Sequence, residues 1–328
     1  MRIARDPLDT IGLMEQRVLG RTGRRVGVVG LGAWQIGGDW GEVSEADALA
    51  TIHAAIDAGV DFIDTADVYG DGRSERLIGR VLKERPGLTV ATKMGRRVAQ
   101  TPEVYTLENF RSWIDRSRAN LGVDTIDLVQ LHCPPSPVYD DDRVFDALDT
   151  LVAEGAIRAY GVSVETCAEA LRAIERPGVA TVQIILNMFR LKPLEEVLPA
   201  AEKAGVGIIA RVPLASGLLT GKFGPRSVFA EDDHRTFNRR GEAFDVGETF
   251  SGVEYGVGLQ AVERLRPLVP EGMTMAQFAL RWILDQSGVS VVIPGARNPE
   301  QARANAAAAG FPRLSPEVHA AVRTVYDE

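Results

Sequence analysis

The sequence predicts an α/β protein built as a closed (β/α)8 barrel, the TIM-barrel fold. Short apolar runs alternate with segments of helical periodicity about eight times along the chain. The runs are nearly continuous in apolar residues, which is typical of parallel strands buried on both faces. An open dinucleotide-binding sheet would carry G-x-G-x-x-G after its first strand. The corresponding motif, GLGAWQ from Gly30 to Gln35, lacks the third glycine, so the barrel is favoured.

The N-terminal region is expected to precede the repeated units. Residues 1–13 show no hydrophobic period and are interpreted as a loose extension, followed by a single barrel domain over 14–328. Two short extended runs within residues 17–29 flank a glycine-bounded turn, which predicts a β-hairpin. The second run continues as the expected first barrel strand, 26–31.

The strands and helices then follow in order along the chain. Ser44 predicts the N-cap of the first helix and Gly59 its end. Further strands are expected at 60–64, 88–93, 126–132, 156–163, 180–186, 206–211 and 289–293. Helices are expected at 44–59, 73–85, 106–121, 143–154, 165–175, 194–204, 257–268, 273–285, 298–309 and 315–326. A polar, glycine-rich segment at 221–256 predicts a long loop after the seventh strand, and loops of this length are usually functional.

The composition narrows the classes of binding partner that can be expected. Of 328 residues, 45% are hydrophobic and 25% charged, as in ordinary globular proteins. The net charge of −8 argues against a nucleic acid or an anionic membrane as partner, and neither a transmembrane run nor a signal-peptide core is present in the sequence. Cys133 and Cys167 lack metal-ligand spacing, so no metal and a reduced, cytoplasmic location are expected. The sequence carries no signal for an oligomeric state.

Reactive side chains stand at the ends of three successive predicted strands. The first of these strands closes on Asp64, and Tyr69 follows five residues later in the loop. The next two strands end in Lys93 and His132. Chemistry in a parallel α/β barrel is placed at the carboxyl ends of the strands. The sequence therefore predicts a polar cluster of these four residues at one end of the barrel.

Two loops have the composition of phosphate-binding sites. Barrel phosphate sites lie after the seventh and eighth strands. The loop Pro213–Lys222, PLASGLLTGK, offers glycines, backbone N–H groups and a lysine. The turn Pro294–Arg297, PGAR, immediately precedes a helix, whose N-terminus favours anions. Both loops occur where a bound phosphate is expected.

With these motifs in place, the chain resembles the aldo-keto reductase superfamily from about Val18 to Asn305. The matching motifs are GVDFIDTADVYG, TVATK, DLVQLH, YGVS, PLASGLLTGK and IPGARNPEQARAN. The resemblance implies a barrel that moves hydride between a nicotinamide cofactor and a small-molecule carbonyl or alcohol substrate.

The resemblance also assigns a catalytic tetrad of Asp64, Tyr69, Lys93 and His132. Tyr69 is expected to donate the proton, although a free phenol has a pKa of about 10. The Lys93 ammonium is expected to lower that pKa, with Asp64 pairing to hold Lys93 in place. His132 is expected to hydrogen-bond the substrate oxygen and orient it.

The cofactor is expected to be NADP(H), with NAD(H) possible. Arg297 stands at the turn into helix 298–309, where its guanidinium and the helix N–H groups could reach a 2′-phosphate. By resemblance, the cofactor contacts fall on Ser163, Gln183, Arg211, Pro213, Leu214, Ser216, Gly217, Leu219, Lys222, Gly295, Ala296, Arg297, Gln301 and Asn305.

Two positions depart from the family pattern. Val164 stands where an asparagine often follows the serine, which removes one expected contact to the carboxamide. Arg211 stands where an aromatic residue often stacks on the nicotinamide. A planar guanidinium can also stack on a ring, but it brings positive charge beside the nicotinamide.

Aromatic residues mark a candidate substrate pocket. Trp34 and Trp40, in the loop after the first strand, are expected to line it. The segment 224–256 is expected to fold over cofactor or substrate and contains Phe229, His234, Arg235, Phe237 and Phe244.

Three functions agree with these residues. The first is an NADP(H)-dependent aldo-keto reductase of aldehydes, ketones or sugars. The second is an alcohol or sugar dehydrogenase that works mainly in the oxidative direction. The third is a non-catalytic, cofactor-binding regulatory subunit, which would have no need of a Tyr–Lys pair. The substrate depends on loop residues rather than on the fold.

Overall fold

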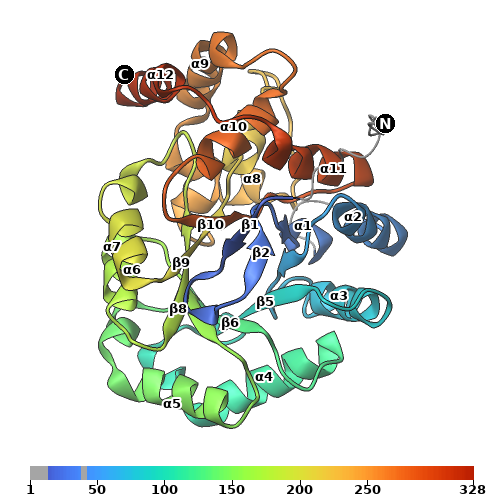
Figure 1. Ribbon diagram of the computed structural model, residues 1–328, viewed down its shortest axis with the longest axis vertical. Helices are drawn as coiled ribbons and strands as arrows, with labels where there is room; N and C mark the ends of the chain where they lie inside the picture. The colour runs from blue at the N-terminus through green and yellow to red at the C-terminus, as the bar shows by residue number, and fades with distance from the viewer. Residues whose placement is uncertain (1–13, 38–42) are drawn as a thin grey trace, which may run out of the picture.

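The computed structural model describes residues 14–37 and 43–328. Eight parallel strands lie side by side in the order β10-β9-β8-β7-β6-β5-β4-β3. Parallel bridges from Val29 to Val292 and from Gly32 to Gly295 join the two ends of this sheet. The predicted (β/α)8 barrel is therefore confirmed, with helices around its outside (Figure 1).

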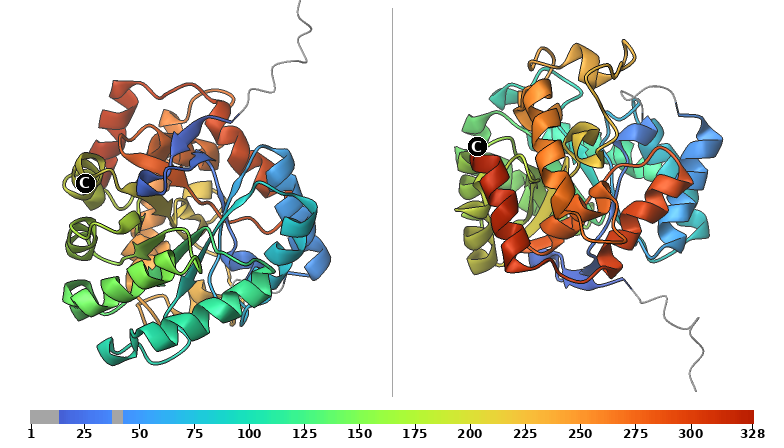
Figure 2. Two further views of the ribbon diagram at one scale, coloured as in Figure 1. Left: turned by 60° about the horizontal axis from the view of Figure 1, so that its bottom comes forward. Right: turned by 90° about the horizontal axis from the view of Figure 1, so that it is seen from above.

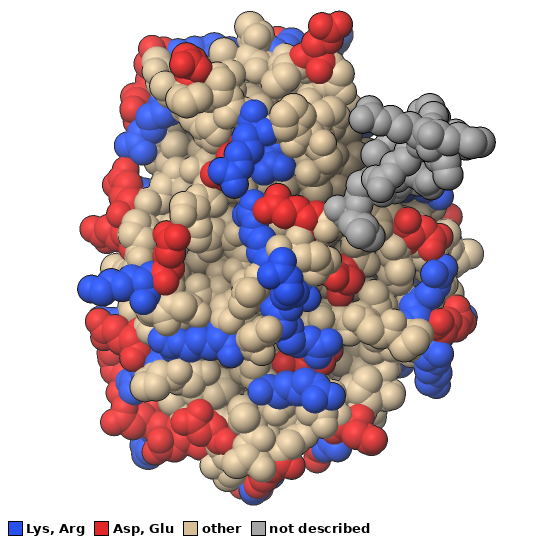
Figure 3. Space-filling view, in the orientation of Figure 1, with Lys and Arg blue, Asp and Glu red and all other residues tan. Residues whose placement is uncertain are grey.

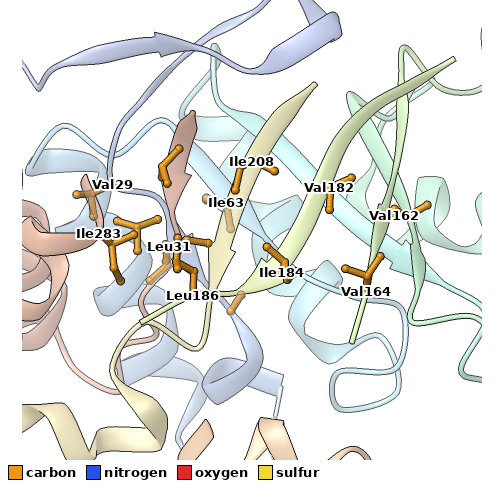
Figure 4. Close-up of a cluster of buried hydrophobic side chains, with 14 of the residues drawn as sticks. Val29, Leu31, Ile63, Val162, Val164, Val182, Ile184, Leu186, Ile208 and Ile283 are labelled. Atoms are coloured by element: carbon orange, nitrogen blue, oxygen red, sulfur yellow. The ribbon is translucent and has the colours of Figure 1, made fainter. Parts of the chain in front are cut away.

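The strands are short and almost wholly buried. Those of the barrel are β3 Leu31–Gly32, β4 Phe62–Asp64, β5 Thr89–Met94, β6 Leu128–His132, β7 Tyr160–Ser163, β8 Val179–Ile185, β9 Gly207–Arg211 and β10 Val289–Val292. Successive side chains on a strand point to opposite faces. Phe62 thus belongs to a small cluster inside the barrel, whereas Ile63 belongs to the large core between strands and helices. Figure 4 shows members of that outer layer, among them Ile63, Val182 and Ile208.

The helices follow the predicted ranges within a few residues. They are α1 Trp34–Gly37, α2 Glu45–Asp57, α3 Arg73–Glu84, α4 Leu107–Leu121, α5 Asp142–Ala153, α6 Cys167–Ile174, α7 Val197–Ala204, α8 His234–Phe237, α9 Tyr255–Leu265, α10 Met275–Leu284, α11 Pro299–Ala307 and α12 Pro316–Asp327. The predicted cap of α2 is confirmed, because the Ser44 side chain accepts a hydrogen bond from the N–H of Asp47. Short helices α1 and α8 were not predicted from the sequence.

The N-terminal hairpin closes the amino end of the barrel. It consists of β1 Gln16–Val18 and β2 Arg25–Gly27, which pair antiparallel. Leu19 and Val26 are fully buried in the interior cluster. The hairpin and the long loop lie at opposite ends of the barrel (Figure 2, right).

Arginines fasten the hairpin to the barrel. Arg17 donates hydrogen bonds to the backbone carbonyls of Leu284 and Val289, 2.9 and 2.8 Å away. The Arg21 guanidinium reaches four further backbone carbonyls, those of Arg176, Pro177, Val179 and Ala204. Figure 3 shows basic side chains across this face of the molecule.

One predicted element is wrong. The run 26–31 was expected to be a single barrel strand, but the structure divides it. Arg25–Gly27 pairs with Gln16–Val18 to form the hairpin, whereas Leu31–Gly32 is the strand that pairs with β4 in the barrel sheet. The apolar run is continuous in sequence because both pieces are buried, so hydrophobicity alone could not locate the break.

Two further expectations cannot be compared with the structure. The extension at residues 1–13 and Trp40 both lie outside the described residues. Within the described ranges, no helix combines the length and apolar character needed to cross a bilayer.

Candidate active site

The four predicted tetrad residues meet at the carboxyl end of the barrel. Asp64, Lys93 and His132 occupy inward positions near the ends of β4, β5 and β6. Tyr69 follows β4 in a tight turn whose next three residues, Gly70, Asp71 and Gly72, all have positive φ. The registers of neighbouring parallel strands place these side chains around one space. The sequence positions alone were thus enough to locate the cluster.

Asp64 and Lys93 form a buried ion pair. The Lys93 Nζ donates to Asp64 Oδ1 and, at 2.9 Å, to the carbonyl of Thr65. The second carboxylate oxygen, Asp64 Oδ2, accepts hydrogen bonds from the amides of Gln130 and Gln183 at 3.1 and 2.7 Å. Burial lowers the pKa of Lys93, but Asp64 and Tyr69 outweigh it and raise the pKa above its usual value. Lys93 is therefore held as a cation.

Tyr69 lies between this pair and His132. The Lys93 Nζ is 5.2 Å from the centre of the Tyr69 ring. The His132 ring stands nearly perpendicular to it, with 6.0 Å between ring centres. Burial raises the pKa of Tyr69 above its ordinary value of 10.0, and Lys93 offsets only part of that effect. Lys93 thus acts on this pKa in the expected direction, but burial outweighs the ammonium.

His132 is held neutral by its surroundings. Burial lowers the pKa of His132 well below its usual range, and the cations Arg96, Lys93 and Arg211 act in the same direction. Its Nδ1 is buried without a hydrogen-bond partner among the described residues. A neutral imidazole can donate or accept one hydrogen bond, as orientation of a substrate oxygen requires.

A single cavity of about 800 Å³ connects the tetrad with both predicted phosphate loops. It falls within the usual size range of ligand pockets, about 300–1,000 Å³. The predicted residues along its wall are Trp34, Asp64, Tyr69, Lys93, His132, Ser163, Gln183, Arg211, Pro213, Leu214, Ser216, Gly217, Lys222, Gly295, Ala296, Arg297, Gln301 and Asn305. Leu219 differs from its prediction, because its side chain is fully buried in the hydrophobic core and does not line the cavity.

The loop after β9 has several residues in the left-handed backbone region, which gives it the curved shape expected of a phosphate-binding loop. Val212, Ala215, Ser216 and Gly217 all have positive φ. A Cβ at Gly217 would lie 2.8 Å from the Phe223 ring, so a side chain there would be crowded as well as strained. The Ser216 hydroxyl donates to the Glu248 carbonyl at 2.9 Å and accepts from the Phe250 N–H at 3.0 Å. Ser216 therefore ties this loop to the long loop that follows.

The turn before α11 is braced by two side chains expected to contact cofactor. Gln301 Oε1 accepts the backbone N–H of Arg297 at 2.9 Å. Asn305 Nδ2 donates to the carbonyl of Gly295 at 3.1 Å. Both residues still border the cavity. The Arg297 guanidinium is exposed at the wall and forms no ion pair within residues 14–37 and 43–328.

These features fit a dinucleotide. The cavity runs without interruption from Tyr69 to the first turn of α11, and that end carries Lys222 and Arg297. Cations and helix N–H groups suit phosphates, while Ser163 and Gln183 offer polar groups near the tetrad. The lining of the cavity therefore fits a dinucleotide cofactor.

Aromatic side chains from the long loop cover the tetrad. Trp34 stacks on Tyr69, with 6.0 Å between ring centres and 16° between planes. From the loop, His234 and Phe244 approach Trp34 with ring centres 5.0 and 5.9 Å away. The end of the cavity at the tetrad is therefore flanked by Trp34 and Phe244.

Arg211 has a charged partner and a backbone partner of its own at the cavity wall. Its guanidinium forms an ion pair with Glu248 at 2.6 Å and donates to the Val164 carbonyl at 2.9 Å. Burial raises the pKa of the Glu248 carboxyl, but Arg211 and Arg96 outweigh it, so the pKa of Glu248 is lowered. The positive charge expected beside the nicotinamide therefore has a carboxylate partner.

Sequence reasoning missed two residues at the site, Gln130 and Glu248. Gln130 donates to Asp64 alongside the predicted Gln183, and a glutamine inside the apolar run of β6 was a signal that could have been used. Glu248 borders the cavity from the long loop, where no periodicity distinguishes functional from solvent-facing residues.

Another buried carboxyl, that of Asp67, lies in the loop between Asp64 and Tyr69. It is fully buried, and neither carboxylate oxygen has a hydrogen-bond partner among the described residues. Burial and then Glu75 raise the pKa of Asp67 to about 7, while Arg97 and Arg116 oppose the rise. Both arginines pair instead with the exposed Asp71.

Among the described residues, one group could offer ligand atoms to a metal. Single ligand atoms of Cys133, Glu165 and Glu248 lie within 4.8 Å of one another. Arg96 pairs with Glu165 at 3.2 Å, and Arg211 pairs with Glu248. The two guanidinium groups already neutralise these carboxylates, and the expectation that no metal is bound stays a prediction.

Comparisons with known proteins agree with this geometry. A family model described as the aldo/keto reductase family matches residues 28–327. Aldo-keto reductase YhdN of Bacillus subtilis is 33% identical over 309 residues, covering 89% of this chain and 87% of that protein. A probable voltage-gated potassium channel subunit beta of Oryza sativa subsp. japonica is 30% identical, covering 93% and 94%. The solved glycerol dehydrogenase AKR11B4 from Gluconobacter oxydans has a TM-score of 0.79 at 32% identity, covering 94% of each chain.

Proposed function

The chain belongs to the aldo/keto reductase family, and from that premise we propose that it is an NADP(H)-dependent reductase of an aldehyde, ketone or sugar. The observation that carries the proposal is the placement of Tyr69 beside a buried Lys93 cation and a neutral His132 in a cavity that continues to Arg297. A cavity built only to bind a cofactor would not need a phenol next to an ammonium.

The proposed reaction uses each tetrad residue in one role. Tyr69 donates its phenolic proton to the oxygen of the carbonyl substrate as that oxygen gains negative charge. Lys93 stabilises the phenolate that remains, and Asp64 keeps Lys93 charged and in place. His132 hydrogen-bonds the substrate oxygen and so directs it toward Tyr69. A bound nicotinamide cofactor would supply the hydride.

The residues proposed to hold the cofactor form three groups along the cavity. Ser163 and Gln183 would hold the carboxamide, although the Gln183 amide nitrogen already donates to Asp64. The loop after β9 would hold the pyrophosphate through its backbone N–H groups and Lys222. Arg297 would hold the 2′-phosphate, with Gln301 and Asn305 acting through the turn they brace.

Tyr69 can serve the reaction in either direction. Burial raises the pKa of Tyr69, which keeps the phenol in the proton-donating form that carbonyl reduction uses. Alcohol oxidation would use the phenolate of the same residue as a base. The comparison of turnover in the two directions therefore decides between reduction and the dehydrogenase alternative.

The test is turnover of NADPH with a panel of aldehydes, ketones and sugars, set against NADP⁺ with the matching alcohols. We expect oxidation of NADPH by at least one carbonyl substrate. Faster turnover of alcohols with NADP⁺ would assign the dehydrogenase function instead. Tight NADPH binding with no turnover in either direction would support a non-catalytic regulatory subunit; the rice relative is named a probable voltage-gated potassium channel subunit beta.

The cofactor preference depends on Arg297. Replacing it with alanine is expected to weaken NADPH binding about 10- to 100-fold, since a charge-assisted contact is worth about 1.5–3 kcal/mol. NADH, which lacks the 2′-phosphate, should lose little. Dissociation constants of both cofactors from fluorescence titration provide the measurement.

Arg303→Ala is the matched control for this substitution, because Arg303 is exposed on α11, the helix that follows this turn, and does not line the cavity. Equal weakening of NADPH and NADH by Arg297→Ala, or no weakening of either, would remove the support for NADP(H).

We also propose that residues 14–328 form one domain.

We further propose a cytoplasmic location. Both cysteines are free thiols, which suits a reducing compartment.

A further inference from the structure

A four-membered charge cluster lies beside the tetrad. It consists of the ion pair Arg211–Glu248 at 2.6 Å and the ion pair Arg96–Glu165 at 3.2 Å. Arg211 ends β9, whereas Glu248 comes from the short helix η7, Val246–Glu248, in the long loop. Both of these side chains are more than nine-tenths buried, and both line the cavity.

The Arg211–Glu248 pair is fixed from both sides. Arg211 donates to the carbonyl of Val164, directly after Ser163. On the other side, the Glu248 carbonyl accepts the Ser216 hydroxyl at 2.9 Å. The pair therefore joins the end of β9 to the loop that covers the site.

The net charge of the cluster is zero, with two guanidinium groups and two carboxylates. Loss of the Glu248 charge would leave one uncompensated cation beside the proposed nicotinamide position. Buried charges interact strongly because little solvent screens them. The effect of the cluster also reaches the tetrad, since Arg211 helps to lower the pKa of His132.

We propose that Glu248 is a positioning residue that neutralises Arg211 and thereby sets the relative affinity for oxidised and reduced cofactor. The proposal rests on the function proposed above. An oxidised nicotinamide ring carries a positive charge and a reduced ring carries none. A lone Arg211 cation would therefore repel only the oxidised form, and a lone Glu248 carboxylate would attract only that form.

Two single substitutions are expected to change the relative affinity for oxidised and reduced cofactor in opposite directions. In Glu248→Gln, we expect the ratio of the NADP⁺ dissociation constant to that of NADPH to rise about tenfold, a difference of about 1.4 kcal/mol between the two forms. In Arg211→Met, the same ratio should fall. The double variant should return toward the wild-type ratio, because its cluster is neutral again.

The measurement is fluorescence or calorimetric titration of each folded variant with NADPH and with NADP⁺, without substrate. Glu263→Gln is the matched control, because it removes the partner of an exposed arginine, Arg266, on the surface. Shifts of opposite sign in the two single variants cannot arise from a loosened loop. If Glu248→Gln does not fold, Arg211→Met and the double variant still test the sign and its reversal.

The inference would be overturned if the ratio stayed unchanged, or if each variant weakened both cofactor forms equally. Equal weakening would mean that the pair only holds the loop in place. Failure of the wild type to bind either form would instead contradict the proposed function, so the two failures are distinguishable.

Discussion

Replacing Tyr69 with phenylalanine is expected to lower kcat for carbonyl reduction by about 10²–10⁴-fold, the usual worth of general acid–base help. The ring remains, so its stacking on Trp34 and its place beside His132 are retained. Only the acidic O–H is lost. The dissociation constant of NADPH should therefore stay close to that of the wild type. Single-turnover kinetics, in which chemistry limits the rate, give the measurement.

Tyr160→Phe is the control, because Tyr160 donates its O–H to Asp149 at 2.7 Å and does not line the cavity. That variant should lose some stability but keep its single-turnover rate. A wild-type rate in Tyr69→Phe under the same conditions would show that Tyr69 is not the proton donor.

Replacing Asp67 with asparagine is expected to stabilise the protein at pH 8 and to have little effect near pH 4. The folded chain holds the Asp67 proton up to about pH 7, whereas the ordinary carboxyl pKa is 3.8. The free energy of unfolding therefore falls as the pH rises between these two values, because the carboxyl ionises in the unfolded chain before it ionises in the folded one. The difference corresponds to about 4 kcal/mol, at about 1.4 kcal/mol for each tenfold change in a protonation equilibrium.

Chemical denaturation of wild type and Asp67→Asn across pH 4–8 measures this effect. The wild-type stability curve should fall through that range more steeply than the curve of the variant. Asp124→Asn serves as the control, since Asp124 is exposed. Equal slopes for wild type and Asp67→Asn would mean that the native carboxyl is already ionised near pH 4.

The sequence was most informative where local pattern and topology coincide. Asp64, Lys93 and His132 end apolar runs, and in a parallel barrel the ends of such runs meet in space. The prediction needed no knowledge of which strands are neighbours. The i, i+4 spacing of Gln301 and Asn305 also placed both on one side of a helix correctly.

Other features depend on contacts that sequence does not encode locally. Glu248 forms an ion pair with Arg211, which lies 37 residues earlier in the chain, and the loop between them has no repeating pattern. The direction of the Tyr69 pKa shift depends on how completely the ring is buried, which outweighs the charge of Lys93. The break between the hairpin and β3 depends on pairing partners, since both sides of the break are equally apolar.

The hairpin held by Arg17 and Arg21 lies at one end of the barrel and the cavity at the other, and this arrangement matters when the protein is attached to a solid support. Leu19 and Val26 plug the end of the barrel opposite the cavity, so a tether joined ahead of residue 14 would leave the molecule from its sealed end. On a sensor chip or a resin, such a tether would present the cavity mouth to the solution. Attachment through side chains of the long loop would instead place the support against the entrance that substrate must use.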